Sequence, residues 1–228
     1  MIISHRYKFI FIKTVKTAGT SLEIALSKYC GPHDIISPLV EEDELKRRAL
    51  GYPPAQNYFV PIHEYSLRDI IRRVRYRNRL RYFNHASARY IRSHVARDIW
   101  NSYFKFCFER DPWDKFMSWY YWEYREEPRP DISSLIQSDR LNRLRDMGWG
   151  LYTDDSRVIV DRVYTFEDME NALTDISERL GLDEWPSLPH AKGNFRKNKS
   201  FTELMSETDK KRIEEVFSQE IEMFGYGK

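Results

Sequence analysis

Three stretches of the chain switch from a strand-like to a helix-like spacing of hydrophobic residues. In residues 7–26, an alternating aromatic and aliphatic run leads through a short polar loop into aliphatic residues at helical spacing. Residues 103–124 and 157–180 show the same order, with a β-branched or aromatic run followed by a helical pattern. This repeated order of strand, turn and helix predicts a three-layer α/β domain with a mainly parallel central sheet.

Weaker patterns complete the expected order of elements. Residues 33–37 predict a short strand, and residues 80–84 predict another that ends just before a helix starting near Ser87. An apolar stripe along residues 208–224 predicts a last helix that packs on the sheet.

The length of 228 residues suits a single domain with an ordinary hydrophobic core. Residues 38–80 and 125–157 interrupt the α/β pattern with prolines and polar runs, so we interpret them as insertions in one domain spanning residues 1–228. Binding functions concentrate in loops that a rigid scaffold holds in place. We therefore expect ligand recognition in these two insertions.

The charges nearly balance, with 37 Lys and Arg against 35 Asp and Glu, and the net charge of +2 does not indicate a nucleic-acid-binding protein. Residues 68–81, however, hold seven arginines against Asp69. Such a cluster suits an anionic acceptor or nucleic acid, but no interleaved aromatics or DNA-reading motif support nucleic acid, and we predict none as a partner. The preferred interpretation is a solvated helix with four aliphatic residues facing the core: Leu67, Ile70, Ile71 and Val74.

The cysteines and histidines offer no metal chemistry. Cys30 and Cys107 make neither a metal set nor a disulfide framework, and the six histidines lack zinc-ligand spacing, so we predict no metal. No apolar run approaches the roughly 20 residues of a membrane span, and the first residues enter a strand pattern directly. We therefore expect a cytoplasmic protein without a membrane partner.

The loop at residues 13–21 carries the first candidate chemistry. Lysines, hydroxyl side chains and Gly19 lie between a strand and a helix, where backbone N–H groups and a helix dipole suit a phosphate or sulfate. The plainer alternative is a turn glycine with hydroxyls that cap the helix. The motif G-x-x-x-x-G-K-[ST] is absent because no glycine precedes Lys16, which disfavours an ATP or GTP hydrolase.

A second candidate site follows the strand at residues 103–109. Asp111 and Pro112 are typical of the N-cap and first position of a helix, which places Arg110 at its start and Ser118 two turns along. An arginine and a hydroxyl at a helix N-terminus suit a phosphate monoester. The alternative is an ion pair of Arg110 with a nearby carboxylate.

His85 is expected at the carboxyl end of the strand at residues 80–84. Ligands of open α/β sheets lie outside the carboxyl ends of the strands, and an imidazole can take a proton from a hydroxyl. An isolated histidine is otherwise more often a structural hydrogen-bonding residue.

These segments resemble motifs of sulfotransferases that use 3′-phosphoadenosine-5′-phosphosulfate (PAPS). K-T-A-G-T-S at residues 16–21 resembles the 5′-phosphosulfate loop of the carbohydrate-type and bacterial branch, and residues 110–120 resemble the 3′-phosphate element R-[DN]-P-x5-S-x-Y. Residues 84–88 are similar to K-H-A-[ST]-A, although Asn84 replaces the usual lysine or glycine. Residues 166–169 are similar to Y-E-D-M.

The resemblance implies a P-loop-like sulfotransferase fold and transfer of a sulfuryl group from PAPS to a hydroxyl of a carbohydrate or small metabolite, without a metal. It implies that Lys16 stabilises the leaving phosphate and that His85 is the general base. The two insertions would then recognise the acceptor, and a basic loop near the C-terminus would close over the 3′-phosphate. The implied cofactor contacts are Thr17, Ala18, Gly19, Thr20, Ser21, Arg110, Ser118, Phe166 and Arg196.

Two other functions stay open from the sequence. An ATP-dependent phosphotransferase would need a magnesium-binding carboxylate and affinity for ATP. A non-catalytic module built on residues 68–81 would bind polyanions with a steep salt dependence and show no turnover.

Overall fold

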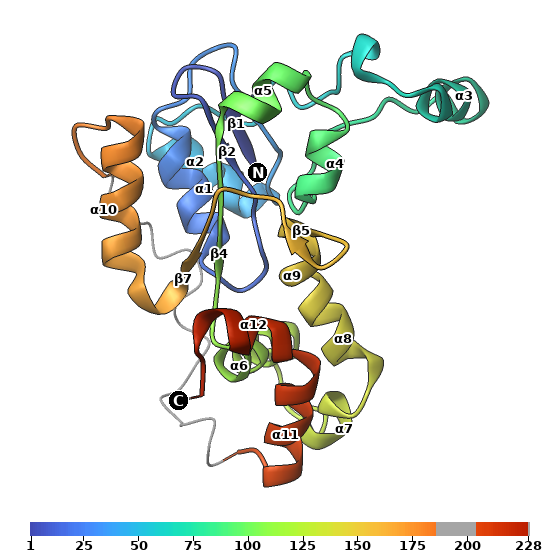
Figure 1. Ribbon diagram of the computed structural model, residues 1–228, viewed down its shortest axis with the longest axis vertical. Helices are drawn as coiled ribbons and strands as arrows, with labels where there is room; N and C mark the ends of the chain where they lie inside the picture. Colours follow the sequence, from blue (N-terminus) through green and yellow to red (C-terminus); the bar gives the residue numbers. More distant parts are fainter. Residues whose placement is uncertain (186–203, 228) are drawn as a thin grey trace.

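A five-stranded sheet forms the centre of the computed structural model, which describes residues 1–185 and 204–227 (Figure 1). The strand order is β3-β1-β2-β4-β7, and β4 pairs in parallel with β2 and with β7. β1 is antiparallel to both of its neighbours, so the other four strands share one direction, which confirms the mainly parallel sheet. The strands are β1 (Ile2–Ser4), β2 (Phe9–Phe11), β3 (Ile35–Ile36), β4 (Phe104–Glu109) and β7 (Arg162–Thr165).

Helices cover both faces of this sheet, because successive strand side chains point to opposite faces. Phe11 and Phe106 pack in one hydrophobic cluster with residues of α1 (Gly19–Ser27) and α10 (Met169–Leu180). Ile10 and Cys107 pack in another. That second cluster includes residues of α4 (Ala88–Arg92), α5 (Arg97–Ser102) and α9 (Trp149–Tyr152). The three-layer prediction is confirmed.

A third cluster of helices lies beyond the carboxyl end of β4 (Figure 1). It joins α6 (Pro112–Glu123), α7 (Ile132–Ile136), α8 (Asp139–Asp146), α11 (Glu207–Val216) and α12 (Ser218–Phe224). The prediction of one last helix packed on the sheet was wrong. The helix is interrupted at Phe217, and the apolar residues of its two halves pack with those of α6 to α8 instead.

Residues 80–84 do not form a strand of the sheet, contrary to prediction. Arg81 makes an isolated bridge with Phe59, and both edges of β2 and of β4 are already paired with other strands. The segment is held by Tyr82, which is 1% exposed and donates its hydroxyl to the carbonyl of His94. The helix expected near Ser87 is confirmed, because α4 has Ser87 as its N-cap.

The two insertions contain short helices and a hairpin. Residues 38–80 include α2 (Glu41–Ala49), the 3-10 turn η1 (Ile62–Glu64) and α3 (Leu67–Tyr76). The arginine-rich segment is helical as predicted, but its aliphatic residues do not face the core, since Leu67 is 81% exposed and Val74 is 77% exposed. The reason is that α3 stands apart from the other elements (Figure 1). The remaining elements are β5 (Thr153–Asp154), β6 (Arg157–Val158) and the 3-10 turn η2 (Phe166–Asp168).

A buried ion pair connects β4 with α6 and α9. Lys115 Nζ lies 2.5 Å from Glu109 Oε1, and the Tyr152 hydroxyl donates to Glu109 Oε2 at 3.1 Å. Gly148 passes directly over this pair, where a Cβ atom would clash with Lys115 Nζ and lie 3.0 Å from Glu109 Oε2. Both side chains are fully buried, and Glu109 also accepts hydrogen bonds from the Arg110 N–H and the Tyr152 hydroxyl, so moving the pair would disturb these contacts.

We expect Gly148→Ala to lower the free energy of unfolding by about 1–3 kcal/mol through overpacking of this ion pair. Gly150→Ala is the matched control, since its Cβ would meet the nearest atom at an ordinary 3.7 Å, and it should change stability by less than about 0.5 kcal/mol. Urea denaturation of both variants measures the difference. Equal changes in the free energy of unfolding for the two variants would show that the close contact with Lys115 and Glu109 does not decide the cost of an alanine at position 148.

Candidate active site

The loop at residues 13–21 connects β2 with α1 in a shape that suits an anion. Lys16 and Ala18 have positive φ angles of 66° and 58°. The N–H groups of Thr17 to Ser21 donate to no backbone carbonyl within residues 1–185 and 204–227, and no side chain caps α1. Successive N–H groups in such a loop form a concave donor site for phosphate or sulfate.

The loop is anchored to the elements beside it. Thr14 donates its hydroxyl to the carbonyl of Phe108 on β4 at 2.5 Å, and the Thr14 and Thr17 hydroxyl oxygens lie 2.9 Å apart. The N–H of Val15 donates to the carbonyl of Met147 at 3.1 Å. The Thr17 side chain therefore stabilises the loop.

Lys13 lies under the loop and not on the surface. It is 2% exposed, and its ammonium group lies 3.1 Å from a carboxylate oxygen of Glu23 in α1. Gly19 allows this arrangement, because a Cβ there would lie 2.7 Å from Lys13 Cγ. Burial alone would raise the pKa of Glu23, but three positive charges outweigh it and hold that pKa below its ordinary value: those of the Met1 amino group, Lys13 and Arg47.

His85 reaches the same loop although it follows no strand of the sheet. Its Nδ1 atom lies 2.8 Å from the carbonyl oxygen of Lys13. Because a carbonyl only accepts, Nδ1 carries the proton and Nε2 keeps its lone pair, with Asn84 Nδ2 at 3.4 Å. The pKa of His85 is lowered to about 4, mainly by burial; the hydrogen bond to the Lys13 carbonyl opposes this shift, and the charge of Lys13 adds to it. The imidazole is therefore neutral at neutral pH.

Arg110 joins the loop to the end of β4. Its Nη1 atom donates to the carbonyl of Lys16 at 3.2 Å, and its Nη2 atom lies 3.3 Å from a carboxylate oxygen of Asp114. The guanidinium carbon lies 4.2 Å from the centroid of the Phe166 ring. The buried Nε atom has no hydrogen-bond partner among the described residues. Arg110 thus lies beside Phe166, the predicted adenine-side residue.

Ser118 lies on the face of α6 that is turned toward Lys16 and Arg110. Asp114, Ser118 and Trp122 are spaced by four residues, so they share one side of the helix. Asp114 contacts Arg110, and the Trp122 ring centroid lies 5.2 Å from Lys16 Nζ. The sequence analysis did not single out Trp122 among the aromatic residues of this helix. Its four-residue spacing from Ser118 places both on one helix face and could have identified it.

The three loops that carry these residues follow neighbouring parallel strands. Residues 13–21 follow β2, Arg110 follows β4 and Phe166 follows β7. The carboxyl ends of parallel strands are where α/β folds bind their ligands. Arg196, expected to contact the 3′-phosphate, lies outside the described residues.

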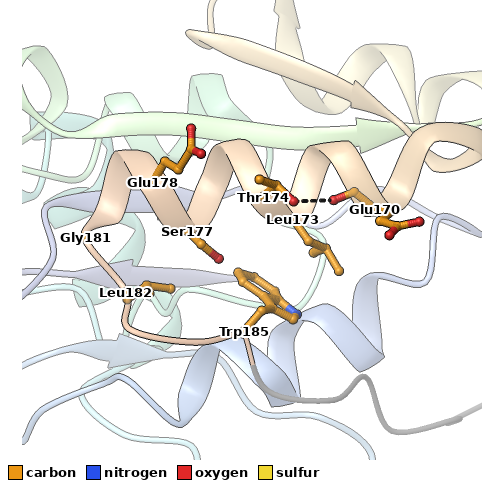
Figure 2. Close-up of a pocket in the computed structure, with 8 residues that line it drawn as sticks. All are labelled: Glu170, Leu173, Thr174, Ser177, Glu178, Gly181, Leu182 and Trp185. Atoms are coloured by element: carbon orange, nitrogen blue, oxygen red, sulfur yellow. Dashed lines mark hydrogen bonds between the residues drawn. The ribbon is translucent and has the colours of Figure 1, made fainter.

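A separate pocket lies along α10 and the turn that follows it (Figure 2). Leu173, Ser177 and Trp185 are among its lining residues, and none of the predicted site residues lines it. It is therefore distinct from the loop site at the strand ends.

Within the described residues, no group of three or more His, Cys, Asp or Glu side chains could hold a metal ion. In that same part of the chain, no helix has the length and apolar character needed to cross a membrane.

The chain belongs to the sulfotransferase family, because residues 1–227 match the family described as "Sulfotransferase family". Members are PAPS-dependent enzymes, and the α/β fold and the suspected relationship are confirmed. The chain is also similar to an "Uncharacterized protein" of Archaeoglobus fulgidus, with 32% identity over 98 residues, which covers 41% of this chain and 81% of the relative.

We expect the imidazole of His85 to titrate near pH 4 instead of near 6.5, because protonation would place a charge in a buried site. Histidine NMR signals followed between about pH 3 and 8 measure this, and His85→Gln assigns the resonance by its loss. A midpoint between 6 and 7 would mean that the ring is more hydrated than its position indicates.

Proposed function

We propose that this sulfotransferase transfers a sulfuryl group from PAPS to a hydroxyl of a carbohydrate or small metabolite. One observation carries the proposal: the backbone carbonyls of Lys13 and Lys16 accept hydrogen bonds from His85 and Arg110. A single loop thereby gathers a neutral imidazole, a guanidinium and a row of N–H donors. Family membership supports PAPS as the donor and a hydroxyl as the acceptor.

The residues around the loop suit the two phosphate positions of PAPS. The N–H groups of Thr17 to Ser21 suit the 5′-phosphosulfate, because they are directed to no backbone carbonyl of the described residues. The guanidinium of Arg110 and the hydroxyl of Ser118 suit the 3′-phosphate, and the Arg110 Nε atom, which has no hydrogen-bond partner in the described part of the chain, supports this assignment. Phe166 would contact the adenine side, and Arg196 would add a charge over the 3′-phosphate.

The proposed chemistry uses a base and a cation on opposite sides of the transferred group. PAPS supplies the sulfuryl group and leaves as adenosine 3′,5′-bisphosphate. Nε2 of His85 takes the proton of the acceptor hydroxyl, since Nδ1 is occupied by the carbonyl of Lys13. The ammonium of Lys16 and the loop N–H groups offset the charge that develops on the departing phosphate oxygen.

The acceptor is proposed to contact the insertions at residues 38–80 and 125–157. The second insertion is also part of the core, since Leu141, Leu144, Trp149 and Tyr152 are buried. Acceptor contacts from this region would therefore come from its exposed residues.

Adenosine 3′,5′-bisphosphate should raise the thermal midpoint more than adenosine 5′-monophosphate or Mg-ATP does, because only it places a phosphate at Arg110. At 100 times its Kd, a ligand stabilises by about 2.7 kcal/mol. Arg110→Ala should weaken binding of the bisphosphate about 10- to 100-fold through loss of a charge-assisted hydrogen bond. Arg143→Ala, on the exposed face of α8, is the matched control.

A preference for Mg-ATP would favour the ATP-dependent phosphotransferase. Retention of the bisphosphate preference by Arg110→Ala would place the 3′-phosphate elsewhere. Binding of heparin-like polymers without any response to nucleotide would favour the polyanion-binding module.

Lys16→Ala and His85→Ala should each reduce turnover by roughly 10²- to 10⁴-fold, as expected for loss of a charge-stabilising group or a general base. Transfer of labelled sulfuryl from PAPS to a panel of saccharides and small alcohols measures turnover. Nucleotide affinity should fall strongly in Lys16→Ala but stay near the wild-type value in His85→Ala. The exposed residues Lys211 and His33 provide the control substitutions Lys211→Ala and His33→Ala. Near-wild-type transfer by His85→Ala would mean that the base is another group.

A further inference from the structure

Residues 59–83, here called the arginine arm, carry a larger net positive charge than the chain as a whole. They contain seven of the 37 Lys and Arg residues but two of the 35 Asp and Glu residues. The formal charge of the arm is therefore +5, whereas the rest of the chain carries −3. A partner of the arm must be anionic if charge is to favour the contact.

The same arm exposes a continuous apolar stripe. Leu67, Ile70, Ile71 and Val74 have the i, i+3, i+4, i+7 spacing of one helix face, and they are 81%, 43%, 66% and 77% exposed. Phe59, Ile62 and Phe83 at the two ends of the arm are also exposed. Apolar patches of this kind on a soluble protein mark an interaction site.

The arm is attached to the protein in a way that turns this stripe outward. Asp69, on the opposite side of α3, lies 3.5 Å from the ring nitrogen Nε2 of His94. Tyr65 accepts a hydrogen bond from the N–H of Leu80 at 2.7 Å and so joins the two ends of the arm. α3 stands away from the domain (Figure 1), its polar side contacts the domain through Asp69, and its apolar side is exposed to solvent.

The occupant of this face has to supply both negative charge and an apolar environment. A polysaccharide or nucleic acid would pair with the arginines but leave four aliphatic side chains in water. The arm of a second copy would cover those side chains, but the two arms, each with a charge of +5, would repel each other. A bilayer with anionic lipids offers phosphate and carboxylate groups at its surface and hydrocarbon just below them.

We propose that the arginine arm binds the surface of a bilayer that contains anionic phospholipids. α3 lies in the plane of the headgroups, with Leu67, Ile71 and Val74 inserted below them and the arginines at phosphate level. This placement needs no spanning helix, since α3 has ten residues and lies on the membrane. Membrane-surface binding would replace the sequence-based expectation of no membrane partner. The proposal does not depend on the transfer reaction.

Co-sedimentation of the full chain with large unilamellar vesicles tests the proposal. Vesicles of phosphatidylcholine with about 30 mol% phosphatidylserine should bind the protein, whereas vesicles of phosphatidylcholine alone should bind it at least tenfold less. Raising the salt from about 0.1 M to about 0.5 M should weaken binding, because it screens the arginines.

Paired variants separate insertion from simple charge attraction. Leu67→Ser with Val74→Ser should reduce vesicle binding at least about tenfold, since two inserted side chains are lost. Val40→Ser with Leu45→Ser removes two comparably exposed aliphatic residues from the region of α2 and should leave binding unchanged. Circular dichroism and thermal midpoints verify that both variants fold.

Three results would overturn the proposal. The first is equal binding to both kinds of vesicle, or to neither. The second is vesicle binding that the Leu67→Ser and Val74→Ser pair leaves intact, as for a purely electrostatic polyanion site. The third is a concentration-dependent dimer that the same pair abolishes in sedimentation velocity, which would make a second copy the occupant.

Discussion

The backbone of residues 13–16 is the constraint on which the candidate site depends. The carbonyl of Lys13 accepts from His85, which is 72 residues away in sequence, and the carbonyl of Lys16 accepts from Arg110, which is 94 residues away. Both contacts need the loop to hold one conformation. Thr14 provides this by donating to β4, and Gly19 by leaving space for the Lys13 side chain.

Buried charges under the site are paired instead of isolated. Glu23 lies between Lys13 and Arg47, and Glu109 lies against Lys115. Such pairs add little net stability compared with apolar packing, but removal of one partner leaves an uncompensated charge. Lys13 and Lys115 thereby neutralise carboxylates below the loop, whereas Lys16 lies against Trp122 and Arg110 against Asp114 and Phe166.

The arginine arm and the site are joined by a short stretch of chain. Tyr82 is buried at the base of the arm, and His85 follows three residues later with its ring on the Lys13 carbonyl. The base of the arm is therefore well packed, whereas its tip exposes aliphatic side chains and arginines. This division gives one segment two environments, a buried end next to His85 and an outer part whose aliphatic side chains are exposed to solvent.

The sequence by itself determined the features that depend on neighbouring residues. The alternation of residues 104–109, the Asp111 N-cap and the strand-loop-helix at residues 7–26 follow from local spacing and capping, and all three were predicted. Only the tertiary structure decided what depends on distant partners. Residues 80–84 form no strand of the sheet because their backbone pairs with residues 58–60 instead, and the aliphatic face of α3 is exposed because its polar face contacts His94. Lys13 and Lys16 look alike in sequence, yet Glu23 holds one below the loop while Trp122 contacts the other at its mouth.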